Sequence, residues 1–166
     1  MNVEKRIGLL LKEHGWTLSA AESCTGGRIS HIITTVSGSS SYYLGSVTSY
    51  AISVKEQVLG VSSETIAANG VVSSEVAASM AEGVRKLMGS TFAVATTGLA
   101  EGGDRHYPEG TVWLGVSGPE GTFTRIFQIS GDRKANIRRF TTAALLFLEQ
   151  NIKMYIKHCK QDNKTF

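Results

Sequence analysis

The fold is indicated first by residues 16–27, which read Trp16-Thr17-Leu18-Ser19-Ala20-Ala21-Glu22-Ser23-Cys24-Thr25-Gly26-Gly27. The first six residues of this stretch are predicted to form a short strand with small side chains. An apolar stripe with the spacing of a helix follows at Ile29, Ile32, Ile33 and Val36. Residues 21–27 are therefore predicted to connect a strand to a helix.

The same alternation continues on both sides of this stretch. An amphipathic helix precedes it and stops at His14-Gly15, and the strand Tyr42–Tyr50 follows it. Later elements are short helices capped by Ser62 and Ser73, a buried strand Phe92–Thr97, a hairpin of Thr111–Val116 and Thr122–Ile129, and a long last helix opened by Gly131-Asp132-Arg133. We expect an α/β protein, a three-layer α/β/α domain with a mixed β-sheet.

Length and composition limit the classes of protein. The chain has 166 residues, 42% of them hydrophobic, and only two cysteines and two prolines. We expect one domain over residues 1–166, with residues 155–166 as a flexible tail and no disulfide framework. No signal peptide or membrane span is recognisable, so a cytoplasmic protein without membrane contact is expected.

Charge is placed unevenly along the chain. From Arg125 to the end there are nine Lys and Arg residues against three acids, within a total net charge of +3. A basic segment can attract nucleic acid, but this one lacks interleaved aromatics and any nucleic-acid-binding motif. A solvated helix face is the simpler interpretation, and a nucleic-acid partner is not expected.

The loop at residues 23–27 is the first candidate for chemistry. Backbone N–H groups at a helix N-terminus favour an anion, although ordinary capping explains the same residues. Cys24 there is either a nucleophilic thiol or, more commonly, a small buried side chain. The four histidines show no spacing typical of a metal site, so no metal is expected.

A serine-rich turn and the strand after it form the second candidate. Ser40 lies in the turn Gly38-Ser39-Ser40-Ser41, and Tyr50 and Lys55 follow the predicted strand. A neutral lysine amine can activate a serine hydroxyl, but spacing alone favours a capping serine, a strand tyrosine and a surface lysine. Farther along, Arg133 has the guanidinium geometry to hold a phosphate.

Together these segments resemble the CinA C-terminal domain family over roughly Ile7 to Leu148. The resemblance depends on an ordered series of motifs: Ala21-Glu22-Ser23-Cys24-Thr25-Gly26-Gly27, Gly38-Ser39-Ser40, Tyr50 with Lys55, Leu59-Gly60-Val61, Gly70-Val71-Val72-Ser73, Thr97-Gly98-Leu99-Ala100, Gly110-Thr111-Val112-Trp113 and Gly131-Asp132-Arg133. Characterised members are nicotinamide-mononucleotide deamidases, which form nicotinate mononucleotide and ammonia without a cofactor or metal. Members are often dimers, so the resemblance implies a homodimer.

The resemblance also implies a Ser-Tyr-Lys catalytic group. By motif position it falls on Ser40, Tyr50 and Lys55, with Lys55 taking the proton of Ser40. The residues expected to bind substrate are Thr25, Gly26, Gly27, Ser39, Thr97, Gly98 and Arg133.

The chain departs from the family pattern at two points. Ile52 replaces an asparagine between the tyrosine and the lysine, and Glu101 adds a negative charge in a loop that is shorter before Gly110. Three alternatives to the Ser40 amidase therefore stay open. They are a Cys24 nucleophile, a catalytically impaired nucleotide-binding module of the same fold, and, least favoured, a nucleic-acid-binding protein.

Overall fold

A five-stranded mixed sheet forms the centre of the molecule. The computed structural model describes residues 1–162, and the strands follow the order β2-β1-β3-β4-β5 across the sheet. Their bounds are β1 Leu18–Glu22, β2 Tyr43–Thr48, β3 Phe92–Leu99, β4 Thr111–Gly118 and β5 Gly121–Gln128. β1 pairs in parallel with both β2 and β3, whereas β3, β4 and β5 pair antiparallel. The expected hairpin before the last helix is confirmed as β4–β5.

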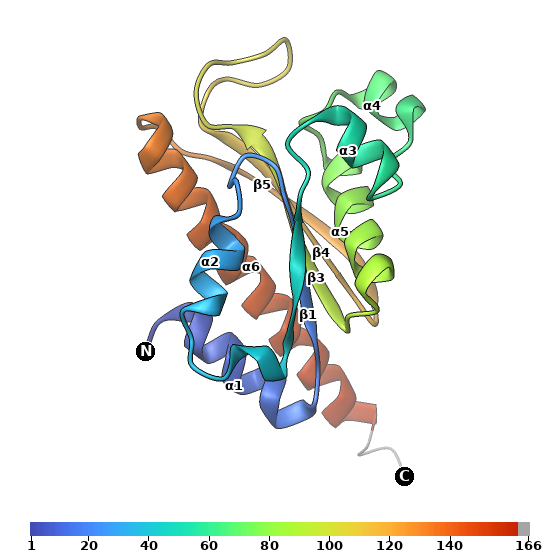
Figure 1. Cartoon of the computed structure of the whole chain (residues 1–166), viewed down its shortest axis with the longest axis vertical. Helices are drawn as coiled ribbons and strands as arrows, with labels where there is room; N and C mark the ends of the chain where they lie inside the picture. Colours follow the sequence, from blue (N-terminus) through green and yellow to red (C-terminus); the bar gives the residue numbers. More distant parts are fainter. Residues whose placement is uncertain (163–166) are drawn as a thin grey trace.

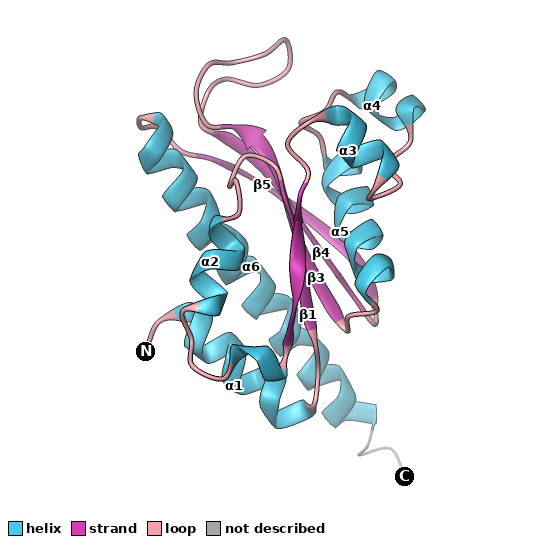
Figure 2. Ribbon diagram, viewed as in Figure 1, coloured by secondary structure: helices cyan, strands magenta, loops and turns pink. Residues whose placement is uncertain are grey.

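Helices cover both faces of this sheet, as Figure 2 shows. One face is covered by α1 Val3–His14, α2 Arg28–Thr34 and α6 Arg133–Asp162. The other is covered by α3 Ile52–Gln57, α4 Ser63–Asn69 and α5 Ser74–Met88, and a 3-10 turn, η1 Ser39–Ser41, precedes β2. The expected three-layer α/β/α architecture with a mixed sheet is confirmed.

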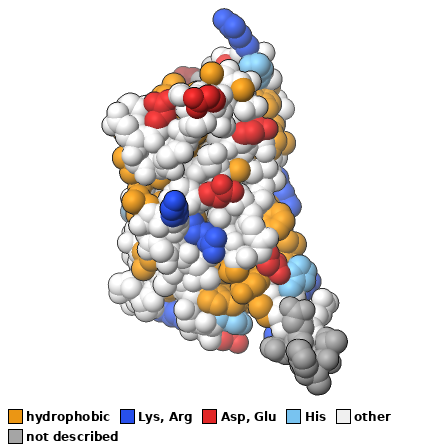
Figure 3. All heavy atoms as spheres, turned by 90° about the vertical axis from the view of Figure 1, so that its right-hand side faces the viewer, with side chains coloured by type: hydrophobic (Ala, Val, Ile, Leu, Met, Phe, Trp, Pro, Cys, Tyr) orange, Lys and Arg blue, Asp and Glu red, His pale blue; other side chains and the backbone are white. Residues whose placement is uncertain are grey.

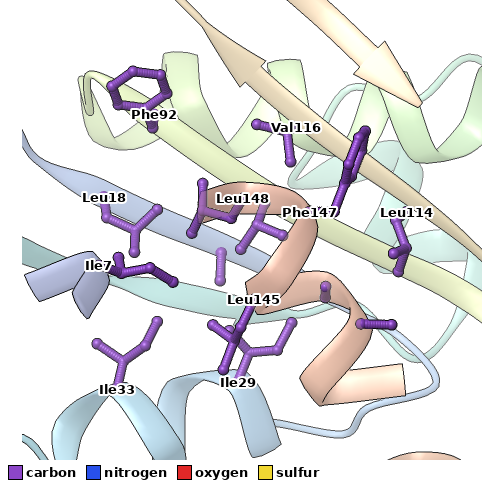
Figure 4. Packing of buried hydrophobic residues seen from close by; sticks show 14 of the residues in the cluster. Ile7, Leu18, Ile29, Ile33, Phe92, Leu114, Val116, Leu145, Phe147 and Leu148 are labelled. Carbon is purple, nitrogen blue, oxygen red and sulfur yellow. The ribbon is translucent and has the colours of Figure 1, made fainter. Parts of the chain in front are cut away.

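The larger part of the hydrophobic core lies between the sheet and the layer of α1, α2 and α6. Ile7 of α1 and Ile33 of α2 meet Leu18 of β1, and Leu145 and Leu148 of α6 complete the cluster (Figure 4). All five side chains are essentially inaccessible to water. Burial of aliphatic side chains on this scale supplies most of the stabilisation of a domain of this size.

The second part of the core lies under α5, which approaches the sheet closely. A Cβ atom built on Gly115 of β4 would lie 2.4 Å from the carbonyl oxygen of Ala77 in α5. Glycine is therefore required at that strand position, because any side chain would push the helix away from the sheet.

Residues 155–162 belong to α6, so the expected tail from residue 155 is wrong for this part of the chain. The Tyr155 ring packs on Phe92 and Trp16, at centroid distances of 5.8 Å and 5.0 Å. This aromatic contact ties the last turns of the helix to the core. Residues 163–166, the rest of the predicted tail, lie outside the described residues.

The three parallel strands end at the same end of the molecule, and the loops that follow them gather there. The carboxyl ends of β1, β2 and β3 lie at the upper end of Figure 1, with the loop 99–110 and the beginning of α6. η1 lies at the opposite end beside α1. Ligands of open α/β sheets bind at the carboxyl ends of the strands, so the upper end is where a site is expected.

Candidate active site

A lysine and a serine meet at the carboxyl end of β1. Lys55 Nζ lies 2.9 Å from Ser23 Oγ and also donates hydrogen bonds to the carbonyl oxygens of Ser49, at 2.5 Å, and Tyr50, at 3.4 Å. Ser23 follows the last residue of β1, and Lys55 projects from α3 beneath the end of β2. The structure thus brings together one lysine amine and one serine hydroxyl from separate segments.

Burial disfavours the charged form of Lys55. The residue is only 1% exposed, and desolvation lowers the pKa of its ammonium group. In the neutral form, two N–H bonds can serve the two carbonyl oxygens while the lone pair faces the Ser23 hydroxyl. The same three contacts therefore suit an amine that accepts a proton from Ser23.

Glu22 fixes the turn that carries Ser23. Its carboxylate is fully buried and accepts hydrogen bonds from Thr25 Oγ1 at 2.6 Å, Gly27 N at 3.1 Å, Ile29 N at 2.9 Å and Ser30 N at 2.9 Å. The backbone N–H of Ser23 donates to Thr96 O, which ties the serine to β3. The N-terminus of α2 is thus occupied by the chain's own carboxylate.

This occupation corrects the expected anion site at residues 25–27. Thr25 is buried, and its hydroxyl is engaged by Glu22 and by Thr96 Oγ1 at 2.8 Å. Gly26 and Gly27 adopt positive φ angles of 60° and 94°, which glycine alone adopts readily, and they form the tight turn between β1 and α2. The amide of Gly27 already donates to Glu22 and that of Gly26 to the carbonyl oxygen of Ser23, so neither is free for a ligand anion.

The expected contact between Ser40 and Lys55 is wrong. Ser40 is exposed in η1, before β2, whereas Lys55 lies after the other end of that strand. Because β2 has six residues, about 20 Å of strand separates the two segments. Ser39 is buried in the same 3-10 turn, so it too lies away from Lys55 and Ser23.

Tyr50 and Arg133 lie near Ser23 and are joined to each other. Arg133 Nη2 donates to the Tyr50 hydroxyl at 3.0 Å, and Arg133 Nη1 lies 3.9 Å from Glu101 Oε2. The Tyr50 side chain is 64% exposed, and it is the Tyr50 carbonyl oxygen that accepts a bond from Lys55. The Tyr50 hydroxyl, which the resemblance places in the catalytic group, is thus hydrogen-bonded to Arg133.

Two further expected residues lie on β3. Gly98 lines the hollow beside Ser23, and a Cβ atom on it would lie 2.6 Å from Thr111 O, so the glycine also permits the close pairing of β3 with β4. Thr97 is buried and donates to Val71 O at 2.8 Å. Its hydroxyl therefore holds the loop before α5 and is not offered to a substrate.

The thiol of Cys24 is expected to be unreactive. Burial raises its pKa to about 12, so it stays protonated near neutral pH. Cys24 lies in the wall of the same hollow. Its position beside the serine does not make it a nucleophile, which weakens the cysteine alternative.

Ser23 opens into a pocket of about 220 Å³. The pocket is lined by Ser23, Cys24, Tyr50, Gly98, Leu99, Ala100, Glu101 and Arg133. A larger hollow of about 550 Å³ lies between α3 and α5, but its ionisable lining residues are Glu82 and Lys86, without a serine–lysine pair of the kind found at Ser23. The pocket at Ser23 is therefore the best place in the described chain for a reaction.

Other kinds of site find little support among residues 1–162. No three His, Cys, Asp or Glu side chains in this range gather as metal ligands. On the face of α3, α4 and α5, charged side chains of both signs are scattered and form no basic surface (Figure 3). In the same range, no helix has both the length and the apolar character to cross a bilayer.

The sequence pattern of the CinA C-terminal domain family matches residues 1–152. The chain belongs to this family. A CinA-like protein of Salinibacter ruber is 46% identical over 147 residues, and one of Flavobacterium psychrophilum is 43% identical over 158 residues. These alignments cover 87% and 93% of the chain but 36% and 38% of the relatives, so the chain spans about a third of their length.

Solved structures of CinA proteins share the fold. A CinA superfamily protein of Klebsiella pneumoniae 700603 superposes with a TM-score of 0.88 at 29% identity, covering 93% of this chain and 99% of that one. A competence/damage inducible protein of Agrobacterium tumefaciens gives a TM-score of 0.86 at 32% identity, covering 89% and 92%. Membership is thus supported by sequence and by fold.

Sequence reasoning missed the serine that contacts Lys55 and the glutamate that holds its turn. Ser23 was assigned to an anion-binding loop, and Glu22 was given no role. One signal was available, because Ser23 comes just after the short strand predicted at residues 16–21, and ligands of open α/β sheets bind at the carboxyl ends of strands. No local pattern indicated that Lys55 would reach it, since that contact depends on the parallel pairing of β1 with β2.

Proposed function

We propose that the chain hydrolyses the carboxamide of nicotinamide mononucleotide, giving nicotinate mononucleotide and ammonia, with Ser23 as nucleophile and Lys55 as base. The observation that carries this proposal is the 2.9 Å contact between the two side chains. Membership of the CinA C-terminal domain family makes an amidase of this kind compatible with the fold.

The reaction follows from the contacts of Lys55. The neutral amine takes the proton of Ser23, and Ser23 Oγ attacks the amide carbon. As the C–N bond breaks, Lys55 gives this proton to the leaving nitrogen, and ammonia departs. Water then attacks the acyl group, Lys55 takes its proton and returns it to Ser23 Oγ, and the carboxylic acid is released.

The oxyanion of the tetrahedral intermediate needs nearby N–H donors. The amides of Gly27, Ile29 and Ser30 are already bound to Glu22. The amide of Cys24, directly after the nucleophile, is the donor we assign, because a turn after a strand presents it on the same side as the serine hydroxyl.

Arg133 supplies the charge that a mononucleotide requires. It lines the pocket at the beginning of α6, and its guanidinium is held by Tyr50. Guanidinium groups bind phosphate through two parallel hydrogen bonds. Arg133 and Ser23 line the same pocket, so we place the phosphate of the nucleotide at Arg133 and its carboxamide at Ser23.

A catalytically impaired nucleotide-binding module of the same fold is the alternative. Such a module has no use for a lysine amine buried against a serine, an arrangement that costs folding free energy through desolvation. A homodimer stays a prediction.

The proposal is tested by incubating the purified chain with nicotinamide mononucleotide and measuring both ammonia and nicotinate mononucleotide. Equal amounts of the two products are expected, with none above background for Lys55→Met. Binding of the nucleotide without either product would reject the amidase and favour the impaired module.

A further inference from the structure

Glu101 meets the arginine that we assign to the phosphate. Its carboxylate Oε2 lies 3.9 Å from Arg133 Nη1, and both side chains line the pocket at Ser23. Glu101 lies in the loop after β3, whereas Arg133 begins α6. The guanidinium therefore already has two internal partners, the carboxylate of Glu101 and the hydroxyl of Tyr50.

These two residues determine the charge of the pocket wall. The other lining residues carry no charge, since the Cys24 thiol is protonated near neutral pH. Glu101 thus cancels the formal charge of Arg133. An arginine without such a neighbour would present a full positive charge to an incoming anion.

Glu101 has no evident role in holding the fold. Its side chain is 69% exposed, and its described ion pair is the one with Arg133. An exposed carboxylate at this distance is weakly held, so a ligand can displace it. Displacement nevertheless opposes binding, because the freed carboxylate stays close to the phosphate and repels it.

From these contacts we infer that Glu101 is a specificity-determining residue, which competes with the substrate phosphate for Arg133. It reduces the preference of the site for phosphorylated over unphosphorylated pyridine ribosides. The identity of these ligands depends on the proposed function, whereas the competition for Arg133 depends only on the geometry of the pocket.

The test measures binding separately from turnover. Calorimetry on a Ser23→Ala background gives the Kd of nicotinamide mononucleotide and of nicotinamide riboside, with and without Glu101→Gln. The matched control is Glu109→Gln, which removes the same charge from the same exposed loop but lies outside the pocket lining. Melting temperatures confirm that the variants fold.

We expect Glu101→Gln to tighten mononucleotide binding about threefold to tenfold and to change riboside binding less than twofold. Glu109→Gln should change both less than twofold, and 0.5 M salt should reduce the effect of Glu101→Gln. The inference is overturned if Glu101→Gln leaves the Kd of the mononucleotide unchanged or raises it, or if it lowers the Kd of the mononucleotide and of the riboside equally. It is also overturned if Glu109→Gln acts as strongly, or if no variant binds the mononucleotide.

Ammonia release, measured with Ser23 intact, separates the two proposals. The expected binding pattern without ammonia release would reject the amidase and leave the role of Glu101 in place. Ammonia release without the binding pattern would reject the role of Glu101 alone.

Discussion

Ser23 Oγ and Lys55 Nζ lie 2.9 Å apart, although 32 positions separate the two residues in the chain. The contact exists because β1 and β2 run parallel and end side by side, with Glu22 paired to Thr48. In the proposed reaction, it links the charge of a buried amine directly to the reactivity of a hydroxyl.

The pH dependence of turnover follows from this link. Lys55 acts as a base only without its proton, and burial lowers its pKa from the ordinary value of 10.5. We expect kcat/KM to rise with pH, with a midpoint below 10.5, and to level off at higher pH. Lys55→Arg keeps its proton throughout this range and should reduce kcat by about 10²–10⁴-fold. A profile that falls across the same range would contradict the role of Lys55.

Cys24 can be replaced without loss of the nucleophile. Because burial raises the pKa of its thiol to about 12, the thiolate is nearly absent at pH 7. Cys24→Ala should keep kcat within about threefold of the unchanged chain, as expected for a wall residue. Alkylation by iodoacetamide, followed by mass spectrometry, should label the half-buried Cys159 well before Cys24. Loss of turnover in Cys24→Ala with normal folding would revive the cysteine mechanism.

Glu22 should govern both stability and turnover. Glu22→Gln replaces one carboxylate oxygen by an NH₂ group, which cannot accept the bonds from the α2 amides. We expect a loss of about 2–4 kcal/mol in the free energy of unfolding and a lower kcat. Glu64→Gln is the control, since Glu64 is an exposed carboxylate in the first turn of α4. Equal effects of the two substitutions would contradict the buried role of Glu22.

An ion pair between α1 and α6 should make the free energy of unfolding depend on pH in the acid range. Arg6 donates two hydrogen bonds of 2.8 Å and 2.7 Å to Glu149, and Lys153 lies 2.6 Å from the same carboxylate. Arg6, with help from Lys153, lowers the Glu149 pKa from 4.5 to about 2. The resulting stabilisation is complete above pH 4.5 and is lost as the pH falls toward 2.

Urea unfolding of Glu149→Gln checks this dependence. We expect the substitution to lower the free energy of unfolding by about 1–3 kcal/mol at pH 7. Between pH 5 and pH 3, this free energy should fall less than in the unchanged chain. Glu13→Gln, an exposed change on α1, should keep the original dependence. The same acid sensitivity in both variants would show that Glu149 is not its source.

Periodicity and capping residues predicted most of the fold. Gly15 ends α1, Ser62 and Ser73 cap α4 and α5, and the β4–β5 hairpin forms as expected. These features are local, so the sequence alone predicts them well. The predicted tail was wrong for residues 155–162, because Tyr155 is held by the rings of Trp16 and Phe92, which are distant in the sequence.

The site was predicted less completely. Lys55, Tyr50, Gly98 and Arg133 lie around the pocket or directly behind it, whereas Ser40 does not. Several serines precede Lys55, and sequence spacing cannot tell which of them shares its end of the sheet. The parallel register of β1 and β2 makes that choice, and it selects Ser23.

The central claim is tested most directly by comparing kcat for Ser23→Ala and Ser40→Ala with nicotinamide mononucleotide as substrate. We predict a loss of at least about 10³-fold for Ser23→Ala and a change within about twofold for the exposed Ser40→Ala. Full turnover in Ser23→Ala, or loss of turnover in a folded Ser40→Ala, would contradict the account.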